Sequence, residues 1–526
     1  MISMIVLLYP STANAYTFRQ NNCRTGYVSA GVGLPLKRQF VIDLKAPIVS
    51  SPVAVNDTLY IGARDSCIRA FFGTNVLWEH HTGGWVDATP TYMRGHVYAG
   101  SRDGMTYDLD ARTGDSLGMY PSTNQMSSPL VTDSIIAFGR GGGNSHLMAY
   151  GVRSRGYLWH VVNDQMVYSS PAINDSVLVY GDDGGGLFAV DAFTGKRLWK
   201  YATDGGVYLS SPAIDGNRVF FSPGDYDKCV YALNLADGSL LWKSAPQIEA
   251  GAVPLPKRLI WMVAAGSPEH RAQTLTALGK AGAIAPSNAS ALRDVAAGKS
   301  AAFVPLGGNA TSSAAVGDSA VYVVHMEYGY PKNRFSITAF DIATGVEAWS
   351  FSDVRSCELL GFCSSPLVSD SVVFVGWGEG KVYALDAWTG AVLWQDSLDG
   401  DIMASPTAEN GKLYVATYSG KIAVYSRGAD VPGDFVNGTY CYPNPARGRT
   451  AHIQVRAGNA GAMTLTLYTL QEKPVITKSR QMTAGELYIY DWDLKSVANG
   501  AYIAKVTMKY AGGKTDMKFI KIAVLR

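Results

Sequence analysis

The sequence contains few charged residues and no long apolar segment. Lys, Arg, Asp and Glu make up 17% of the 526 residues, against about 25% in an average globular chain, and the formal net charge is only +2. No basic block stands out, so nucleic acid is not expected as the main partner. No apolar run reaches the roughly 18 residues of a membrane-spanning helix, so no transmembrane segment is expected. Because 47% of the residues are hydrophobic, the chain can still bury a large core.

Cysteine is scarce as well. The six cysteines are too few and too scattered to form a disulfide-dense scaffold. None belongs to a CxxC or CxxCH pattern, which excludes a zinc ribbon and an attached c-type haem. Cys357 and Cys363 lie close together in the sequence and could form one local disulfide in an oxidising compartment.

The motifs of several enzyme classes are missing. The Gly-rich stretches are not followed by Gly-Lys-Ser/Thr, no G-x-S-x-G occurs, and none of the eight histidines lies in an HExxH pattern. The acidic stretches at residues 182–186 and 225–227 fit hairpin turns better than a calcium loop. His80 and His81 are adjacent and should point to opposite faces of a strand. No catalytic, cofactor-binding or metal-ligating residue is therefore predicted.

The N-terminus has the pattern of a secretory signal peptide. Residues 2–9 are apolar, and Ala13-Asn14-Ala15 is a small-x-small site, so residues 1–15 are predicted to be cleaved. No Lys or Arg precedes the apolar run, which departs from the usual pattern. No Cys follows the site, which disfavours a lipid anchor. The protein is expected outside the cytoplasm, either secreted or attached to the cell surface.

A repeat of about forty residues organises most of the chain. A complete copy has Ser-Ser-Pro or a variant, two strands with a turn between them, an Asp-x-x-Thr-Gly turn and a strand carrying Trp. Residues 264–300 are an Ala-rich insertion with the spacing of short helices. The copies are anchored at Pro52, Pro90, Pro129, Pro171, Pro212, Pro254, Ala314, Pro366 and Pro406.

Three residue types in the repeat have a physical role. The Asp can accept hydrogen bonds from the turn backbone, the Gly supplies a positive φ, and the Trp is an apolar plug offered to the next sheet. One small sheet cannot bury its faces alone, so the sheets are expected to stack around an axis. The structural residues predicted from the repeat are Trp78, Trp159, Asp191, Gly195, Trp199, Trp242, Asp341, Gly345, Trp349, Asp386, Gly390 and Trp394.

These residues resemble the quinoprotein-type repeat, also called the pyrroloquinoline quinone (PQQ)-like repeat, over residues 37–428. The resemblance implies an all-β propeller of about eight four-stranded blades. The copy at Pro254 lacks the Thr-Gly-Trp element, so eight and nine units both remain open. Residues 39–43 look like an orphan strand, and residues 421–425 end the last copy without a Trp strand. Pairing these two segments would close the ring.

In the dehydrogenases of this repeat family, the resemblance implies a quinone on the axis beside calcium, an adjacent Cys pair, a Trp floor and a catalytic Asp. This chain has no adjacent Cys pair and no Asp or Glu in a matching motif. Trp85, Trp261 and Trp377 lie outside the repeat signature, and core packing explains them better than a funnel. No cofactor is therefore expected, although the resemblance leaves PQQ and calcium open.

A different pattern follows a polar linker at residues 427–440. Residues 441–526 show half-buried strand alternation, which predicts a small β-sandwich. Residues 442–445, 499–502 and 521–526 resemble the immunoglobulin-like C-terminal domains of the flagellar-hook-capping and type IX sorting types. That resemblance implies export and surface attachment.

Three functions are compatible with these observations. The favoured one is an exported, non-catalytic propeller that binds protein or glycan through its loops, with residues 263–310 and 326–334 as candidate contact elements. The second is a PQQ-dependent oxidoreductase that uses the funnel. The third is a role of the outer-membrane assembly type, against which the missing lipid-attachment Cys and the extra sandwich count. The oligomeric state stays open.

Overall fold

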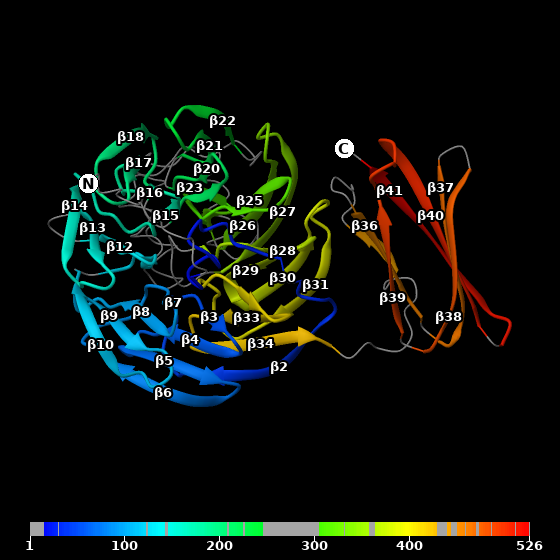
Figure 1. Cartoon of the computed structure of the whole chain (residues 1–526), viewed down its shortest axis with the longest axis horizontal. Helices are drawn as coiled ribbons and strands as arrows, with labels where there is room; N and C mark the ends of the chain where they lie inside the picture. Colours follow the sequence, from blue (N-terminus) through cyan, green and yellow to red (C-terminus); the bar gives the residue numbers. More distant parts are fainter. Residues whose placement is uncertain are drawn as a thin grey trace, which may run out of the picture. The chain divides into compact units, whose positions relative to one another are not determined.

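The computed structural model divides the chain into two units, Met1–Val32 with Arg38–Ser426 and Gly33–Lys37 with Arg427–Arg526. The residues that it describes are 15–29, 31–122, 125–141, 146–207, 210–224, 227–245, 304–330, 332–356, 363–428, 439–442, 450–457, 459–469, 473–484, 486–510 and 512–524. Strands form nearly all of the regular structure in this part of the chain (Figure 1).

The first unit contains eight antiparallel sheets, here called blades one to eight, arranged around an axis (Figure 1). The first strands of neighbouring blades lie against one another at the centre, as β3 does with β7 and with β32. Blades one to four consist of β3 (Val53–Val55), β4 (Thr58–Gly62), β5 (Cys67–Phe72) and β6 (Asn75–His81); β7 (Thr91–Met93), β8 (His96–Gly100), β9 (Met105–Asp110) and β10 (Ser116–Pro121); β11 (Leu130–Val131), β12 (Ile135–Arg140), β13 (His146–Gly151) and β14 (Tyr157–Val162); β15 (Ala172–Asn174), β16 (Val177–Gly181), β17 (Gly186–Asp191) and β18 (Arg197–Ala202).

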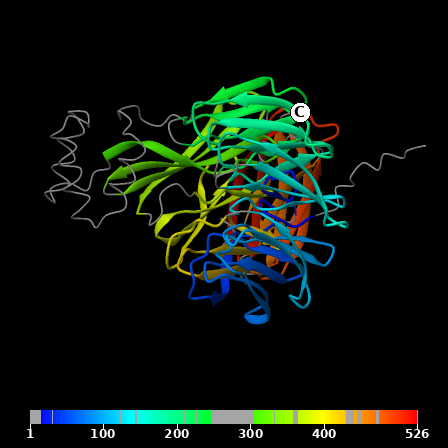
Figure 2. The same ribbon diagram turned by 90° about the vertical axis from the view of Figure 1, so that its left-hand side faces the viewer.

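Blades five to eight complete the ring, and blade six has the longest strands, which extend beyond those of the other blades (Figure 2). Blade seven gains β1 (Tyr27–Val28) in parallel with β28. These blades consist of β19 (Ala213–Asp215), β20 (Arg218–Phe221), β21 (Val230–Asn234) and β22 (Leu240–Ser244); β23 (Val304–Thr311), β24 (Ala315–Val316), β25 (Ala320–Tyr330), β26 (Asn333–Asp341) and β27 (Glu347–Arg355); β28 (Leu367–Ser369), β29 (Val372–Gly376), β30 (Lys381–Asp386) and β31 (Val392–Ser397); β32 (Thr407–Glu409), β33 (Lys412–Ala416), β34 (Lys421–Arg427) and β2 (Leu36–Asp43).

Two observations show that the ring is closed. The N-terminal strand β2 is the outermost strand of blade eight and pairs with β34, as the orphan-strand pattern predicts. A circle of hydrogen bonds, from a backbone N–H of one blade to a side-chain hydroxyl of the next, also runs through the second position of the Ser-Ser-Pro motif. Its members in order are Ser51, Thr89, Ser128, Ser170, Ser211, Ser313, Ser365 and Ser405, which returns to Ser51.

This circle also settles the number of blades in the ring. The backbone N–H of Ser211 in the approach to blade five donates directly to Oγ of Ser313 in the approach to blade six, at 2.9 Å. No further blade therefore separates these two at the axis. The repeat copy anchored at Pro254 and the helices expected within residues 264–300 lie outside the described residues. The expected all-β propeller of about eight blades is confirmed.

The Trp and Gly of the repeat meet at the interfaces between blades. The indole N–H of Trp159 donates to the carbonyl of Ala192 in the next blade, at 3.1 Å. Gly195, in the same turn as Ala192, has a φ of +69° and lies under the Trp159 ring, where a Cβ would come within 2.7 Å of ring atoms. The equivalent Trp–carbonyl pairs are Trp78–Ala111, Trp199–Leu235, Trp242–Ile342 and Trp349–Ala387, while Trp394 contacts Tyr425 edge to face.

The Asp of the repeat shapes the turn that carries this Gly. Oδ1 of Asp191 accepts hydrogen bonds from the backbone N–H of Phe193 and Thr194 and from the Thr194 hydroxyl, at 2.8–3.1 Å. Asp341 and Asp386 make the same three contacts in their own turns. Each turn is thus fixed locally before it packs under the Trp of the preceding blade.

The second unit is a small β-sandwich, as the strand alternation predicts. Its buried core includes Trp492, Leu465 and Val506. One sheet has the order β35 (Tyr440–Tyr442), β36 (Thr450–Arg456) and β39 (Leu487–Asp493), and the other has β38 (Pro474–Met482), β37 (Gly461–Thr469), β40 (Gly500–Tyr510) and β41 (Thr515–Val524). Within the residues that the structure describes, no helix has the length and apolarity to cross a membrane.

Candidate functional site

The centre of the propeller is occupied by the chain's own N-terminal residues. Residues 16–28, here called the axial segment, lie inside the ring (dark blue in Figure 1) and bond to the first strands of successive blades. Backbone hydrogen bonds of 2.7–3.0 Å link it to blades two, four, five, six and seven, and side chains link it to blades three and eight. The partners are Tyr16 with Tyr92, Asn22 with Ile173, Cys23 with Ile214, Thr25 with Val316, Gly26 with Val368, Asn22 with Val131 and Gln20 with Thr407.

Arg24 extends from this segment into the ring. It is 0% exposed, and its guanidinium donates to the carbonyls of Pro171, Ser128 and Pro129 at 3.0–3.2 Å. It also donates to Thr17 within the axial segment. One side chain thereby joins the approaches to blades three and four.

Arg19 does the same on the other side of the axis. Its guanidinium donates to the carbonyls of Ala314 and Pro366, which precede the first strands of blades six and seven. In the described part of the chain, neither Arg19 nor Arg24 has a carboxylate partner. Burial lowers the pKa of each guanidinium to about 9, and for Arg19 the nearby charge of Arg24 acts in the same direction. Both stay positively charged at neutral pH, with backbone carbonyl dipoles in place of counter-ions.

This arrangement does not fit a quinone with calcium at this level of the axis. Calcium prefers six or more oxygen ligands, including carboxylates. The inward carbonyls here already accept hydrogen bonds from Arg19 and Arg24, and two guanidinium charges would repel a further cation. Trp377, one candidate for a funnel wall, is fully buried against Phe335 and Tyr383 between blades six and seven. Trp261 lies outside the described residues.

The two ends of the ring carry different connections. One end, here called the crossover end, has the connections from the fourth strand of one blade to the first strand of the next and the hairpins between second and third strands. The opposite end, here called the turn end, carries the Asp-x-x-Thr-Gly turns. Because strands alternate in direction within each sheet, the side chains of residues 82–88 and 63–66 come together at the crossover end.

An exposed Trp at the crossover end is held by two arginines. Trp85 is 45% exposed, and the guanidinium carbons of Arg64 and Arg102 lie 4.8 Å and 5.5 Å from its ring centroid. Both arginines pair with the buried carboxylate of Asp87, Arg64 at 2.8 Å and Arg102 at 2.6 Å. The guanidinium carbon of Arg64 also lies 5.5 Å from the ring centroid of Tyr418 in blade eight, and Arg64 donates a hydrogen bond to the Tyr418 hydroxyl at 3.1 Å. These five residues, here called the Trp85 cluster, form an ordered aromatic and cationic surface.

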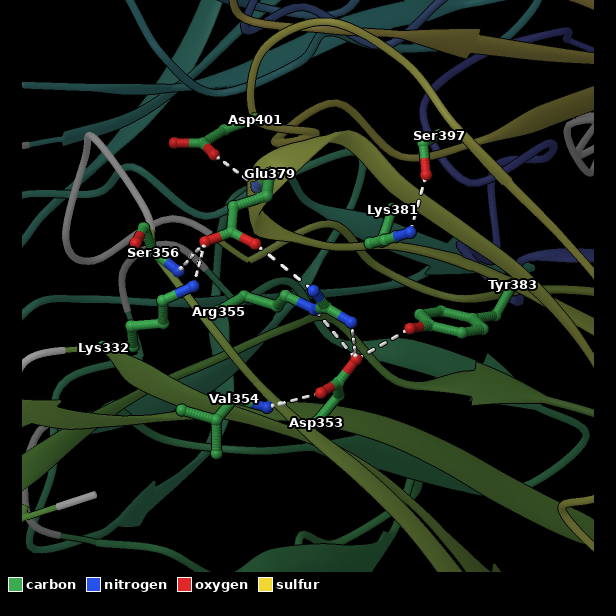
Figure 3. A network of polar contacts seen from close by, with 10 residues as sticks. All are labelled: Lys332, Asp353, Val354, Arg355, Ser356, Glu379, Lys381, Tyr383, Ser397 and Asp401. Carbon is green, nitrogen blue, oxygen red and sulfur yellow. Dashed lines mark hydrogen bonds and ion pairs between the residues drawn. The ribbon is translucent and has the colours of Figure 1, made fainter. Parts of the chain in front are cut away.

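A second polar group at the crossover end joins blades six and seven (Figure 3). Glu379, with a φ of +56°, accepts from Lys332 at 2.6 Å and from Arg355 at 3.3 Å. Arg355 also pairs with Asp353, whose Oδ2 accepts from the Tyr383 hydroxyl at 2.8 Å. Burial would raise the pKa of Glu379, but its hydrogen bonds to Lys332, Ser356 and Arg355 lower it to about 2.

Most of the residues predicted from the sequence are described by the structure, whereas one member of the predicted disulfide is not. The Trp, Gly and Asp residues of the repeat gather at the blade interfaces described above and not at the axis. Cys357 lies outside the described residues, so its disulfide with Cys363 stays a prediction. The axial segment was not predictable from the repeat, because residues 16–36 carry no copy of it. The Trp85 cluster was not predicted either, because its members are far apart in the sequence; the available signal was Arg64, Arg102 and Tyr418 at corresponding hairpin positions.

The closed ring of eight blades with Trp–Gly interfaces defines a β-propeller of the quinoprotein type. The family model described as "Outer membrane protein assembly factor BamB" matches residues 143–330 and 333–466, which is more than half of the chain. The chain belongs to this family.

Individual relatives are more distant. The outer membrane protein assembly factor BamB of Legionella pneumophila (strain Paris) is 32% identical over 94 residues, which cover 16% of this chain and only 22% of that protein. Tetrathionate hydrolase of Acidithiobacillus ferrooxidans is 22% identical over 440 residues, covering 78% of this chain and 73% of that protein. Among solved structures, a europium-containing methanol dehydrogenase has a TM-score of 0.58 at 14% identity, covering 79% of this chain and 98% of that one. The structural similarity concerns the fold alone.

Proposed function

We propose that the protein is an exported, non-catalytic β-propeller that acts as a binding or scaffold module outside the cytoplasm. The observation that carries this proposal is the occupation of the axis by the axial segment and by the guanidinium groups of Arg19 and Arg24. A propeller enzyme needs a chamber where reacting groups converge, whereas a scaffold needs a rigid ring with accessible ends. A ring tied together from within supports the second role.

The crossover end supplies the binding surface in this proposal. Trp, Tyr and Arg are the residues that most often dominate binding energy at protein interfaces. In the Trp85 cluster, Asp87 fixes both arginines, so little side-chain entropy remains to be lost when a partner binds. The chemistry fits a protein partner that presents acidic or carbonyl groups to Arg64 and Arg102 and an apolar surface to Trp85.

The family supports a second candidate, a role in outer-membrane protein assembly. The matched model takes its description from such an assembly factor, but fold and family alone do not assign a partner. In either role the protein works outside the cytoplasm, with residues 1–15 removed as a signal peptide. The C-terminal sandwich would serve in sorting or surface attachment, as its immunoglobulin-like resemblance implies.

Crosslinking in intact cells tests the scaffold role. A photoreactive residue is placed at Met166, an exposed side chain of the crossover end, or at Phe193, an exposed side chain of the turn end. We expect a crosslinked protein adduct from position 166, none from position 193, and loss of the adduct when Trp85→Ala is added. Equal adducts from both ends, or an adduct indifferent to Trp85→Ala, would contradict binding at the crossover end.

A second experiment addresses the oxidoreductase alternative. The purified mature chain is mixed with PQQ and calcium, desalted, and examined for the quinone chromophore and for alcohol-dependent dye reduction. We expect neither to survive desalting, since the described carbonyl oxygens at the level of Arg19 and Arg24 already accept hydrogen bonds from these two guanidinium groups. A retained chromophore with dye reduction would overturn the non-catalytic proposal.

A further inference from the structure

A sulfur, a nitrogen and an oxygen side chain meet on blade one, away from the axis. Cys67 begins β5 and stands directly opposite His81, which ends the neighbouring strand β6. Glu79 lies two residues before His81 and so projects from the same face of the sheet. One ligand atom from each of the three residues lies within 4.8 Å of the other two. Sheet register, rather than a loop, holds this group together.

The contacts within the group direct one carboxylate oxygen of Glu79 toward His81. Sγ of Cys67 lies 3.1 Å from Nδ1 of His81, and Nε2 of His81 lies 3.1 Å from Oε1 of Glu79. Oε2 of Glu79 bonds to Arg69, which also pairs with Asp65 at 2.7 Å. Arg69 thereby orients the Glu79 carboxylate while Oε1 faces the histidine. Such a second partner commonly fixes a carboxylate that ligates a metal.

We propose that Cys67, Glu79 and His81 form a site for a divalent ion of the zinc type. Thiolate, imidazole and carboxylate are the three ligand classes that Zn²⁺ takes in proteins. One thiolate and one carboxylate together carry two negative charges, which balance the two positive charges of the zinc ion. Tetrahedral zinc holds a sulfur and a nitrogen ligand about 3.5 Å apart, close to the separation of Cys67 and His81. The His81 side chain is 75% exposed, so its ring can rotate to present one nitrogen to the ion. The Glu79 carboxylate, which contacts the ring, can then turn its Oε1 toward the same ion.

Binding exchanges a proton for the metal. The Cys67 thiol loses its proton to solvent as the sulfur–metal bond forms. Three protein ligands leave a fourth position for water, which is the composition of an open zinc site. The exposed His81 places that position toward solvent. The inference is independent of the scaffold function, since blade one binds the ion on its outer strands.

The chain offers matched controls for both the cysteine and the histidine. Cys229 occupies the equivalent place in blade five: its backbone N–H bonds to Asp227, as that of Cys67 bonds to Asp65. In the described residues, Cys229 is not part of any such three-ligand group. His80 is the neighbour of His81 but packs on Tyr107, on the opposite face of the strand.

Cobalt titration tests the proposal. The reduced full-length mature chain, carrying no histidine tag, is titrated with Co²⁺ while the thiolate-to-cobalt band in the near ultraviolet is recorded. We expect one equivalent to bind, with the band lost in Cys67→Ser and retained in Cys229→Ser. His81→Gln and Glu79→Gln should weaken binding at least tenfold, His80→Gln should not, and Zn²⁺ should displace the cobalt.

Two results would overturn the proposal: no thiolate band in the unsubstituted chain, or a band that persists in Cys67→Ser. Circular dichroism melts show whether each variant is folded. Because Glu79 and His81 are exposed at the sheet surface, their variants keep the test informative even if Cys67→Ser fails to fold.

Discussion

At the scale of single residues, the contact between Trp and Gly decides how two blades meet. The Trp159 ring packs on Gly195 where any side chain would collide with it, and the indole N–H is satisfied by the carbonyl of Ala192. The glycine is therefore required twice, for its positive φ and for the space that it leaves. A turn that no aromatic ring packs against would need glycine only for its positive φ.

Two glycine substitutions separate these requirements. Gly195 and Gly216 both have positive φ, +69° and +57°, but only at Gly195 does a Cβ meet the ring. We expect Gly216→Ala to cost about 1–2 kcal/mol of unfolding free energy from backbone strain. Gly195→Ala should cost about 1–3 kcal/mol more from overpacking against Trp159. Denaturant unfolding of both variants checks this, and equal losses would contradict the steric role.

The buried Arg24 provides a second test at this scale. Arg24→Met removes a guanidinium that donates to the carbonyls of Pro171, Ser128 and Pro129; the Pro129 carbonyl keeps the Thr91 hydroxyl as a donor, whereas the other two lose the arginine. We expect a loss of about 3–5 kcal/mol in unfolding free energy, because each buried carbonyl left without a donor costs about 1–3 kcal/mol. Arg94→Met, which removes an arginine whose side chain is 59% exposed, is the control and should change stability by under about 0.5 kcal/mol. Similar losses in both variants would refute the bridging role of Arg24.

At the scale of elements, pairs of blades are joined by apolar packing and, at the crossover end, by polar groups. The network of Glu379 links blades six and seven through Lys332 and Arg355 (Figure 3). These side chains are partly exposed, so solvent screening keeps their contribution small. The network orients the longer strands of blade six rather than holding the ring together.

The lowered pKa of Glu379 gives this element a pH dependence. A carboxyl whose pKa is lower in the folded chain stabilises the fold above its unfolded pKa, and that stabilisation is lost as the pH falls through the folded value of about 2. Glu379→Gln should therefore melt below the unsubstituted chain at pH 7, and the gap should narrow as the pH falls below about 4.5. Lys332→Met should show the same narrowing. A gap independent of pH would contradict a charged role for Glu379.

The same scale shows what the sequence could and could not predict. Blades were predictable because Asp386, Gly390 and Trp394 mark one turn and strand within a few residues, and the pattern recurs. The axial segment was not predictable, because Arg19 and Arg24 bond to backbone carbonyls, which leave no pattern in the sequence. The group of Cys67, Glu79 and His81 was not predictable from the sequence for another reason. The pairing of Cys67 with His81 depends on the register of β5 and β6.

At the scale of the whole molecule, the ring is closed by identical chemistry at every step. The hydroxyl of Ser51 accepts the N–H of Ser405 where the two ends of the propeller meet, and the hydroxyl of Ser170 accepts the N–H of Ser128 in mid-ring, both at 2.9 Å. The closing position therefore has no special hydrogen bond of its own. What distinguishes it is β2, which completes blade eight from the N-terminal side.

Two serine substitutions test the equivalence of these positions. Ser51→Ala and Ser170→Ala should each cost about 1–3 kcal/mol, because each leaves one buried N–H without its acceptor. The two losses should agree within about 0.5 kcal/mol if the closing position is as well formed as mid-ring. Thermal and denaturant melts provide the comparison. If Ser51→Ala left the unfolding free energy unchanged while Ser170→Ala lowered it, the ring would be open between blades eight and one.

The axial segment ties the earliest residues of the chain to the latest blade. Gln20 bonds to Thr407, and β2 pairs with β34, so these contacts wait until nearly the entire propeller has been synthesised. Contacts this distant in sequence make folding slow. For the export that we propose, this order of events has a consequence: a chain that closes its ring last would still be unfolded while it passes through a translocation pore, and would close on the far side.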